Sequence, residues 1–222
     1  AIDEFQQILK YHGVNMEAFL RGRIQKLRNT NFIFAGSERR IMNEMFFSDK
    51  RPFFQSATLL QLEPIPLEAY TEFSIRAFHE AGKAITEEAI GWAYMKYEGI
   101  TMYIHHLLHD AWAYTGTGET CELSNMQNMS KQLILQNARR LQELLAYVTE
   151  QQKAVLYAIA TDGKTARVTS SAFVKRHHLK SASAVQSAVK KLLDMDLITE
   201  QGKVYSLSDP MLRIWLNDSA AR

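Results

Sequence analysis

Residues 31–54 read NFIFAGSERRIMNEMFFSDKRPFF, an apolar run that stops at Gly36-Ser37 and passes into a basic, aromatic-rich segment. The first part, residues 32–35, is a short continuous apolar run, which predicts a strand covered on both faces. Gly36 lets the backbone turn as the strand leaves the sheet, which puts Ser37 at the carboxyl end of the strand. Ligands of open α/β sheets bind at that edge, so the Ser37 hydroxyl could touch a phosphate or orient a water. The alternative is that Ser37 only caps a helix over residues 38–47.

A second apolar segment ends in two acids, because the chain begins AIDEFQQI and places Asp3 and Glu4 at the end of a predicted buried strand. Paired acids at a strand end are the Walker B arrangement. The first carboxylate holds the hydration shell of Mg²⁺, and the second polarises the water that attacks the γ-phosphate. An amphipathic helix between the two strands completes a strand–helix–strand unit. Its marker residues are Phe19, Leu20, Arg23, Ile24 and Leu27.

Four short motifs follow one another along the chain. They are Asp3-Glu4-Phe5-Gln6, Phe34-Ala35-Gly36-Ser37, Arg51-Pro52-Phe53-Phe54 and Leu62-Glu63-Pro64-Ile65. In this order and spacing they resemble the archaeal-type ATPases of the STAND branch of AAA-plus P-loop NTPases, which also occur widely in bacteria. In that family the motifs are the Walker B strand, the sensor 1 strand, an Arg-Pro-Phe-Phe segment and the entry into a helical lid. The resemblance runs through nearly the whole chain.

The resemblance implies a fold class that is mostly α with a small α/β remnant. Residues 1–63 would form a partial P-loop NTPase core that holds the Walker B and sensor 1 strands. Residues 64–148 would form the helical lid, and residues 149–222 a winged helix-turn-helix domain.

The resemblance also implies a nucleotide site. Asp3 would hold Mg²⁺ through water, Glu4 would activate the attacking water, and Ser37 would act as the sensor. Arg51 would stabilise the charge that develops during the reaction, a role that Arg39 could also take. The two residues assigned to nucleotide sensing are Arg39 and Thr101.

These residues contain no Walker A loop, which requires G-x-x-x-x-G-K-[ST] between a strand and a helix. Gly163-Lys164-Thr165 does not qualify, because Ala158 stands where the first Gly is needed and a predicted helix precedes it. In the family the P-loop lies upstream of Walker B. We therefore expect the chain to be the C-terminal part of a longer protein. ATP and Mg²⁺ would bind only together with that N-terminal P-loop segment, which is the first expected partner.

The composition indicates an ordinary soluble protein of one to two domains, with 222 residues, 46% hydrophobic and 23% charged. No apolar run approaches the roughly 20 residues of a membrane span, so no membrane partner is expected. Cys121 is the single cysteine and cannot form an internal disulfide, which predicts a reducing, cytoplasmic location. We assign Cys121 no catalytic role, because a lone cysteine is usually a small apolar residue.

The middle of the chain reads as four helices after the rigid connector Pro64-Ile65-Pro66, each with its own start or stop signal. They are predicted from about Leu67 to Ala81, from the residue after Thr86 to Gly99, from a Thr101 cap to Thr115, and from a capping box of Ser124 and Gln127 to about Ala146. This pattern fits an AAA-plus lid and equally any small helical bundle.

One element of the lid, residues 99–104, resembles the family segment that places a helix N-terminus over the nucleotide, which suits a phosphate. Thr101 would then be a sensor; its other interpretation is a plain N-cap. His105 and His109 stand one helical turn apart, as metal ligands can. No H-E-x-x-H pattern and no neighbouring Cys or carboxylate cluster completes a site, so partly buried and surface histidines are favoured over a metal site.

The final third predicts a winged helix-turn-helix. Thr149 and Gln152 form a capping box before the first helix, and Ser170-Ser171 precedes a short second one. The third helix, Ser181 to about Met195, has the most regular apolar spacing in the chain. A hairpin through Gln201-Gly202 and a last helix from Asp209-Pro210 complete the module.

The exposed face of the third helix is small, hydroxylated and basic, and Lys203 lies at the tip of the wing. Such a surface is typical of major-groove readers with a phosphate-contacting wing. The candidate DNA-binding residues are Lys180, Ser183, Gln186, Ser187, Lys190, Lys191 and Lys203. Residues 150–222 hold eleven Lys or Arg and seven Asp or Glu, so the basic excess lies here. Against DNA binding, the third helix carries no Arg, and winged helices of the resembled family also serve as packing domains.

Three functions of different classes follow. The first is an ATP-driven regulatory switch, in which nucleotide state moves the lid and the winged helix against the core. The second is a DNA-binding module that acts without hydrolysis. The third is a protein-interaction scaffold that uses the lid and exposed aromatics, with a protein effector or a second copy of the chain as partner.

Overall fold

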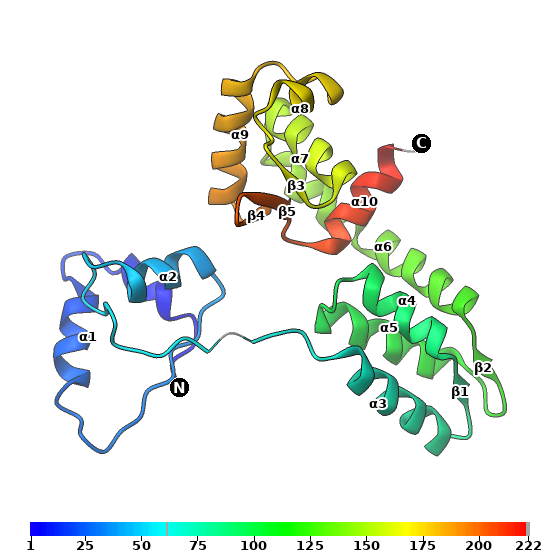
Figure 1. Cartoon of the computed structure of the whole chain (residues 1–222). Helices are drawn as coiled ribbons and strands as arrows, with labels where there is room; N and C mark the ends of the chain where they lie inside the picture. The colour runs from blue at the N-terminus through cyan, green and yellow to red at the C-terminus, as the bar shows by residue number, and fades with distance from the viewer. Residues whose placement is uncertain (61, 221–222) are drawn as a thin grey trace. The chain divides into compact units, whose positions relative to one another are not determined.

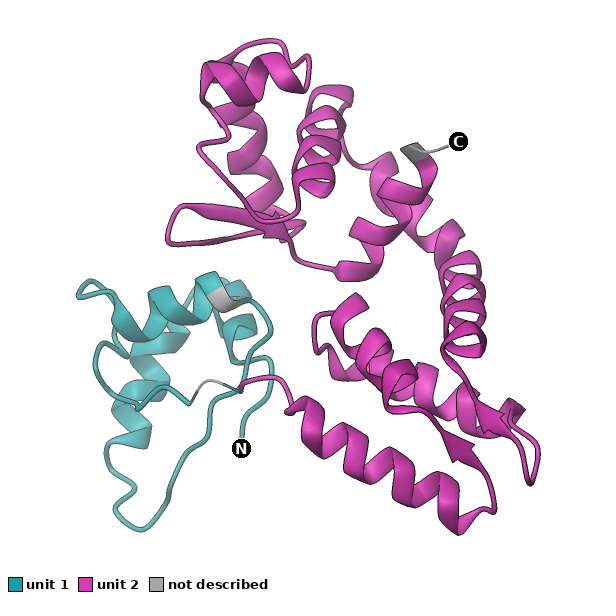
Figure 2. Cartoon of the chain, turned by 45° about the vertical axis from the view of Figure 1, so that its right-hand side comes forward, with its two compact units in different colours: residues 1–62 teal, residues 63–222 magenta. Residues whose placement is uncertain are grey.

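The structure is a computed structural model that describes residues 1–60 and 62–220, apart from the side chains of Arg39 and Ala220 (Figure 1). The chain divides into two compact units, residues 1–62 and residues 63–222, which Figure 2 shows in teal and magenta. The fold is mostly helical, with short parallel pairings and a C-terminal winged helix. This confirms the predicted fold class.

The described residues of unit 1 form one 3₁₀ helix and two α-helices. They are η1 (Phe5–Lys10), α1 (Met16–Ile24) and α2 (Arg39–Phe47). Asn15 caps α1, because its side chain accepts a hydrogen bond from the Ala18 N–H at 3.0 Å. The helix predicted around residues 19–27 is therefore confirmed but ends earlier, so Leu27 lies beyond it.

The two predicted strands of unit 1 are reduced to a single parallel bridge between Ile2 and Phe34. Two hydrogen bonds hold it, from Ile2 N to Ile33 O at 2.8 Å and from Ala35 N to Ile2 O at 2.9 Å. The expectation of a strand covered on both faces is wrong for this structure, because Ile33 is 67% exposed. Within the described residues of unit 1, no further strand flanks the pair.

The core of unit 1 is small and aromatic. Its buried members are Phe5, Met45, Phe46 and Phe53. Phe34 packs on this cluster with its ring centroid 4.3 Å from that of Phe5. The apolar side chains of the 31–54 stretch therefore close over Phe5, which brings the two strand ends together.

Unit 2 begins with four helices and a two-stranded parallel sheet. The helices are α3 (Leu67–Glu80), α4 (Glu87–Lys96), α5 (Thr101–Tyr114) and α6 (Leu123–Ala146), and the strands are β1 (Ala84–Ile85) and β2 (Thr120–Cys121). The four predicted helices are confirmed, and the side chain of Thr86 caps α4. The sheet was not predicted, because two-residue strands carry no periodic pattern.

Two predicted helix starts in unit 2 are wrong. Thr101 is the first residue of α5 and not its cap, which is Ile100. The capping box of α6 consists of Glu122 and Asn125 in place of Ser124 and Gln127. The chain leaves β2 directly into the helix, so the earlier Glu122 is the residue with extended backbone that can cap it.

The last part of unit 2 is the winged helix. Its elements are α7 (Glu150–Asp162), β3 (Thr165–Ala166), α8 (Ser171–Arg176), α9 (Ala182–Asp194), β4 (Ile198–Gln201), β5 (Val204–Leu207) and α10 (Pro210–Ala220). The Thr149 and Gln152 capping box is confirmed. The strands form an antiparallel sheet in the order β3-β5-β4. The hairpin turn is Gly202-Lys203, one residue later than predicted, and both residues have positive φ, as a two-residue hairpin turn requires.

One hydrophobic core runs through the whole of unit 2. It includes Tyr97 at the end of α4 and Ile104 of α5, together with Leu156, Leu192 and Leu212 from the winged helix. The boundary predicted between residues 148 and 149 falls between α6 and α7, inside this unit. Figure 1 shows α10 packed beside α6 and α7, which is where the first four helices of unit 2 and the winged helix meet.

Candidate active site and candidate nucleic-acid interface

The first candidate site lies at the carboxyl ends of the paired segments of unit 1. After the bridge at Ile2, the backbone of Glu4 turns into the left-handed region, with φ 49° and ψ 42°. A side chain in this region costs about 1–2 kcal/mol, so the turn is a strained point of the kind found at functional sites. The Asp3 carboxylate steadies it by accepting the Glu4 N–H at 2.9 Å.

Two predicted site residues that are far apart in sequence meet here. Ser37 Oγ donates to Glu4 Oε2 at 3.1 Å, across 33 residues of chain. Gln6 Nε2 donates to the same oxygen at 2.6 Å and lies 3.4 Å from Ser37 Oγ. Because the Ser37 hydroxyl bonds to Glu4, it does not cap α2, whose cap position is Glu38 without a side-chain bond. The interpretation of Ser37 as a helix cap is therefore wrong.

Gln6 is the residue of this site that sequence reasoning did not assign. Its side chain is buried, with 2% exposed, while Asp3, Glu4 and Ser37 are exposed. The only signal was its place in the Asp3-Glu4-Phe5-Gln6 motif, where it was quoted but given no role.

Arg51 is engaged elsewhere in unit 1. Its Nη1 lies 2.9 Å from Glu17 Oε2 and its Nη2 lies 2.8 Å from Glu44 Oε1, so it ties α1 to α2. Glu17 is 4% exposed, and burial raises its carboxyl pKa although Arg51 opposes the rise. A charge-stabilising role for Arg51 stays a prediction.

The side chain of Arg39 lies outside the described residues, and Thr101 is an exposed residue of unit 2.

The residues present fit the acidic part of a Mg²⁺–nucleotide site. Mg²⁺ prefers oxygen ligands and keeps several of its waters, and the consecutive residues Asp3 and Glu4 are both exposed to solvent. No group of three or more His, Cys, Asp or Glu in the described chain is arranged to hold a metal ion directly. His105 packs edge-on against Tyr70 at 5.6 Å, while His106 and His109 lie near Asp110 at 3.5 and 3.6 Å.

Hydrogen bonds and ion pairs connect the first four helices of unit 2 to the winged helix. Tyr103 Oη, at the start of α5, donates to both Asp209 oxygens at 2.8 and 2.9 Å. Asp209 also accepts the Met211 N–H at 2.8 Å, which caps the first turn of α10, and Arg140 lies 3.8 Å away. A second contact joins Arg213 of α10 to Glu98 at 2.7 Å.

The Tyr103 hydroxyl is a donor throughout the physiological range. Its pKa is raised well above the usual value, first by burial and then by the Asp209 carboxylate. Because the folded-state pKa is the higher one, this stabilisation is complete below about pH 10, the ordinary tyrosine value, and is lost only as pH rises through the raised pKa.

The second candidate site is the outer face of α9. Val185, Ala188, Val189 and Leu192 are buried on the opposite face, and α9 packs against α7. All seven predicted DNA-binding residues are exposed: Lys180, Ser183, Gln186, Ser187, Lys190, Lys191 and Lys203. Ser181 caps α9 by accepting the Ala184 N–H at 3.2 Å.

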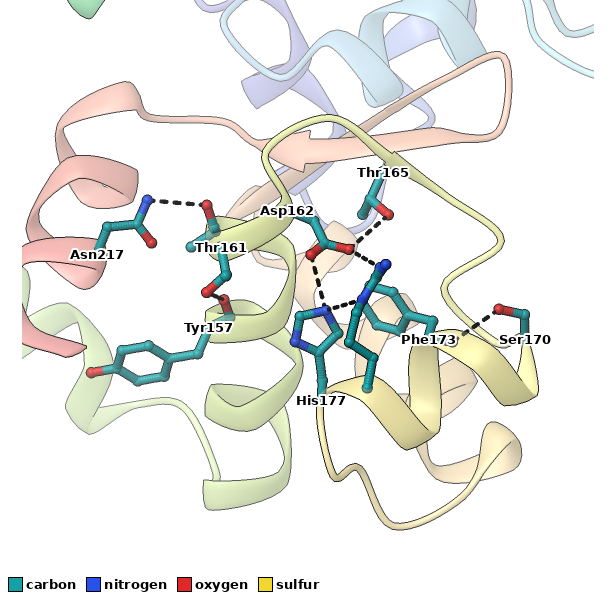
Figure 3. A network of polar contacts seen from close by, with 10 residues as sticks. Tyr157, Thr161, Asp162, Thr165, Ser170, Phe173, His177 and Asn217 are labelled. Carbon is teal, nitrogen blue, oxygen red and sulfur yellow. Dashed lines mark hydrogen bonds and ion pairs between the residues drawn. The ribbon is translucent and has the colours of Figure 1, made fainter. Parts of the chain in front are cut away.

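A polar network fixes α8 against the end of α7 and so shapes the helix-turn-helix (Figure 3). His177 Nε2 lies 3.1 Å from Asp162 Oδ1, Arg176 bonds to Asp162 Oδ2, and Thr165 Oγ1 donates to Asp162 Oδ2 at 3.5 Å. The His177 ring also packs on Phe173, with centroids 4.7 Å apart. The contacts of Asp162 with Arg176 and His177 join residues 14 and 15 positions apart, which no periodic pattern could reveal.

Comparison with known proteins supports the C-terminal winged helix and the fold of nearly the whole chain. Residues 139–218 match a family model described as "Probable winged helix domain". Among solved structures, the chain is similar to a Walker-type ATPase of Pyrococcus abyssi, with a TM-score of 0.68 and 18% sequence identity. The match covers 97% of this chain and 61% of that one. A likeness at this identity shows the fold, which is that of part of a Walker-type ATPase.

Two further findings concern curated proteins and membrane-spanning helices. A search of curated proteins gives no match. Within residues 1–60 and 62–220, no helix combines the length and the apolar character needed to cross a membrane.

Proposed function

We propose that this chain is the C-terminal part of an ATP-binding and ATP-hydrolysing regulatory ATPase of the STAND type, with nucleotide state coupled to the winged helix. The observation that carries the proposal is the meeting of Glu4 and Ser37, 33 residues apart, at the carboxyl end of a parallel pair. That edge is where α/β sheets bind ligands. The likeness to part of a Walker-type ATPase supports the same assignment.

In this proposal the residues of unit 1 act on the water and the metal. Asp3 would hold the hydrated Mg²⁺, and the bound ion would supply positive charge to neutralise the phosphates. Glu4 takes the proton of the attacking water, and Ser37 keeps its carboxylate in place through the 3.1 Å bond. The phosphate-gripping P-loop is contributed by a segment outside this sequence.

In the proposal, the hydrogen bonds from Tyr103 to Asp209 couple the nucleotide state to the winged helix. Thr101 stands two residues before Tyr103 at the start of α5, so a nucleotide sensed there would move the residue that holds α10. Because the lid and the winged helix share one core, they would move as one body.

The test uses the product of the native gene, whose intact mass is first compared with the 25.5 kDa of this chain. Glu4→Gln is expected to reduce ATP turnover by about a hundredfold or more, because the general base is lost, while ATP binding persists. Turnover is measured by phosphate release and binding by equilibrium dialysis. Asp49→Asn, an exposed carboxylate of the same unit, is the matched control. Equal turnover in wild type and Glu4→Gln, or a native product of only 25.5 kDa without turnover, would contradict the proposal.

A second candidate function is DNA binding by the winged helix, favoured by the exposed basic and hydroxylated face of α9. Lys190 and Lys191 would contact phosphates, and each phosphate contact contributes about 0.9 to the slope of log affinity against log salt. Replacing both with alanine should therefore lower that slope by roughly 2 in fluorescence-anisotropy titrations of duplex DNA. Lys131→Ala, an exposed lysine of α6, should leave it unchanged. The absence of binding at low salt would exclude this function and leave a protein-interaction role.

A further inference from the structure

We infer that Gln6 positions the carboxylate of Glu4. The missing side chain at Gly36 leaves the space that the Gln6 amide occupies. The inference rests on the proposed hydrolytic function of the same site. Gln6 donates to Glu4 Oε2 at 2.6 Å from a side chain that is only 2% exposed. Glu4 and Ser37 are both exposed, so Gln6 is the fixed member of the group.

The orientation of the Gln6 amide follows from chemistry. A carboxylate only accepts hydrogen bonds, so the NH₂ group of Gln6 must face Glu4. The carbonyl oxygen, Oε1, then points away, and it is a buried atom without a hydrogen-bond partner in the described structure. Burying an unsatisfied carbonyl destabilises a protein, and such a group in a native fold requires an explanation. The explanation is that the amide must keep this orientation for its NH₂ group to hold the Glu4 carboxylate, which leaves the carbonyl oxygen unpaired.

Gly36 shows how closely the amide is held. A Cβ placed on Gly36 would lie 2.3 Å from Gln6 Oε1 and 2.6 Å from Met42 Sδ, closer than atoms can approach. Gly36 is not among the glycines with positive φ, so the backbone conformation there does not require glycine. The expectation that Gly36 serves to turn the chain is therefore replaced by a need for space beside Gln6.

Both side-chain hydrogen bonds to Glu4 reach the same carboxylate oxygen. Gln6 Nε2 and Ser37 Oγ both bond to Oε2, at 2.6 and 3.1 Å. Oε1 of Glu4 is thereby left as the oxygen that can face a water. A carboxylate held through one oxygen in this way keeps its direction, and a misplacement of about 1 Å can cost as much as a hundredfold in rate.

The experiment replaces Gln6 with methionine, which keeps the length of the side chain and removes the donor. In the native gene product we expect turnover at saturating ATP to fall about tenfold to a hundredfold, with nucleotide affinity unchanged. The melting temperature should stay the same or rise, because the unsatisfied carbonyl is gone. A merely structural glutamine would behave in the opposite way, with lower stability and full turnover.

Two further variants complete the test. Gln7→Met changes the same residue type one position along, where the side chain is partly exposed, and should leave turnover unchanged. Gly36→Ala, which must displace Gln6 or Met42, should lower turnover in the same direction as Gln6→Met. Full turnover in Gln6→Met, together with loss in Glu4→Gln, would overturn this inference alone. A wild-type protein without turnover would contradict the proposed function itself.

Discussion

Phe5→Ala is expected to unfold unit 1 and to leave unit 2 folded. Phe5 is fully buried, and its ring lies 4.3, 5.2 and 5.9 Å from those of Phe34, Phe53 and Phe46. Removing such a ring costs about 3–5 kcal/mol, against roughly 5–15 kcal/mol for the whole stability of a typical domain. A unit of 62 residues with four buried apolar side chains in its core has little free energy of unfolding to lose.

The distribution of aromatic residues makes this result measurable. All three Trp residues, Trp92, Trp112 and Trp215, belong to unit 2. The urea midpoint followed by Trp fluorescence should therefore stay constant in Phe5→Ala, while limited proteolysis should cut between residues 1 and 62. Phe47→Ala is the matched control, because Phe47 follows buried Phe46 in α2 but is 49% exposed. Intact resistance of Phe5→Ala to the protease would show that the aromatic cluster does not hold unit 1 together.

Asp209→Ala is expected to destabilise unit 2 by about 2–4 kcal/mol. Loss of a capping carboxylate costs about 0.5–2 kcal/mol. The Tyr103 hydroxyl, in a side chain that is 5% exposed, would be left without its acceptor, which adds about 1–3 kcal/mol. Urea unfolding followed by Trp fluorescence measures the loss, because Trp215 lies on α10 itself.

The double mutant separates the two contributions. Adding Tyr103→Phe to Asp209→Ala removes the unsatisfied hydroxyl and should recover part of the stability, leaving mainly the cost of the lost cap. Asp218→Ala, an exposed carboxylate later in α10, should change stability by less than about 0.5 kcal/mol. If the effects of Tyr103→Phe and Asp209→Ala are additive in the double mutant, the contact between Tyr103 and Asp209 contributes no coupling energy.

The winged helix was the most predictable part of the chain, because its signals are local. The spacing of Val185, Ala188, Val189 and Leu192 determines which face of α9 is buried, and the Thr149 capping box determines where α7 begins. Both patterns lie within one or two helical turns, where sequence and structure are directly connected.

The candidate active site was only partly predictable, because its contacts are long-range. The pattern around Ser37 favoured a helix cap over a ligand contact; the bond to Glu4 across 33 residues excludes the cap, and the ligand contact stays a prediction. Gln6 carried no separate signal, since its amide lies beside Gly36, which comes from another segment. The apolar run before Gly36 predicted a strand, but whether its faces are covered depends on neighbouring strands that a local pattern cannot supply.

The contact between Tyr103 and Asp209 also bears on the order in which the protein folds during synthesis. The two residues lie 106 positions apart, and α10 follows every other element of unit 2. A nascent chain emerges from the ribosome at about 5–20 residues per second and folds from its N-terminal side. The core of unit 1 lies within the first 53 residues and can assemble early. In unit 2, Met211, Leu212 and Leu216 of α10 must arrive before the apolar surface that they cover is closed to water.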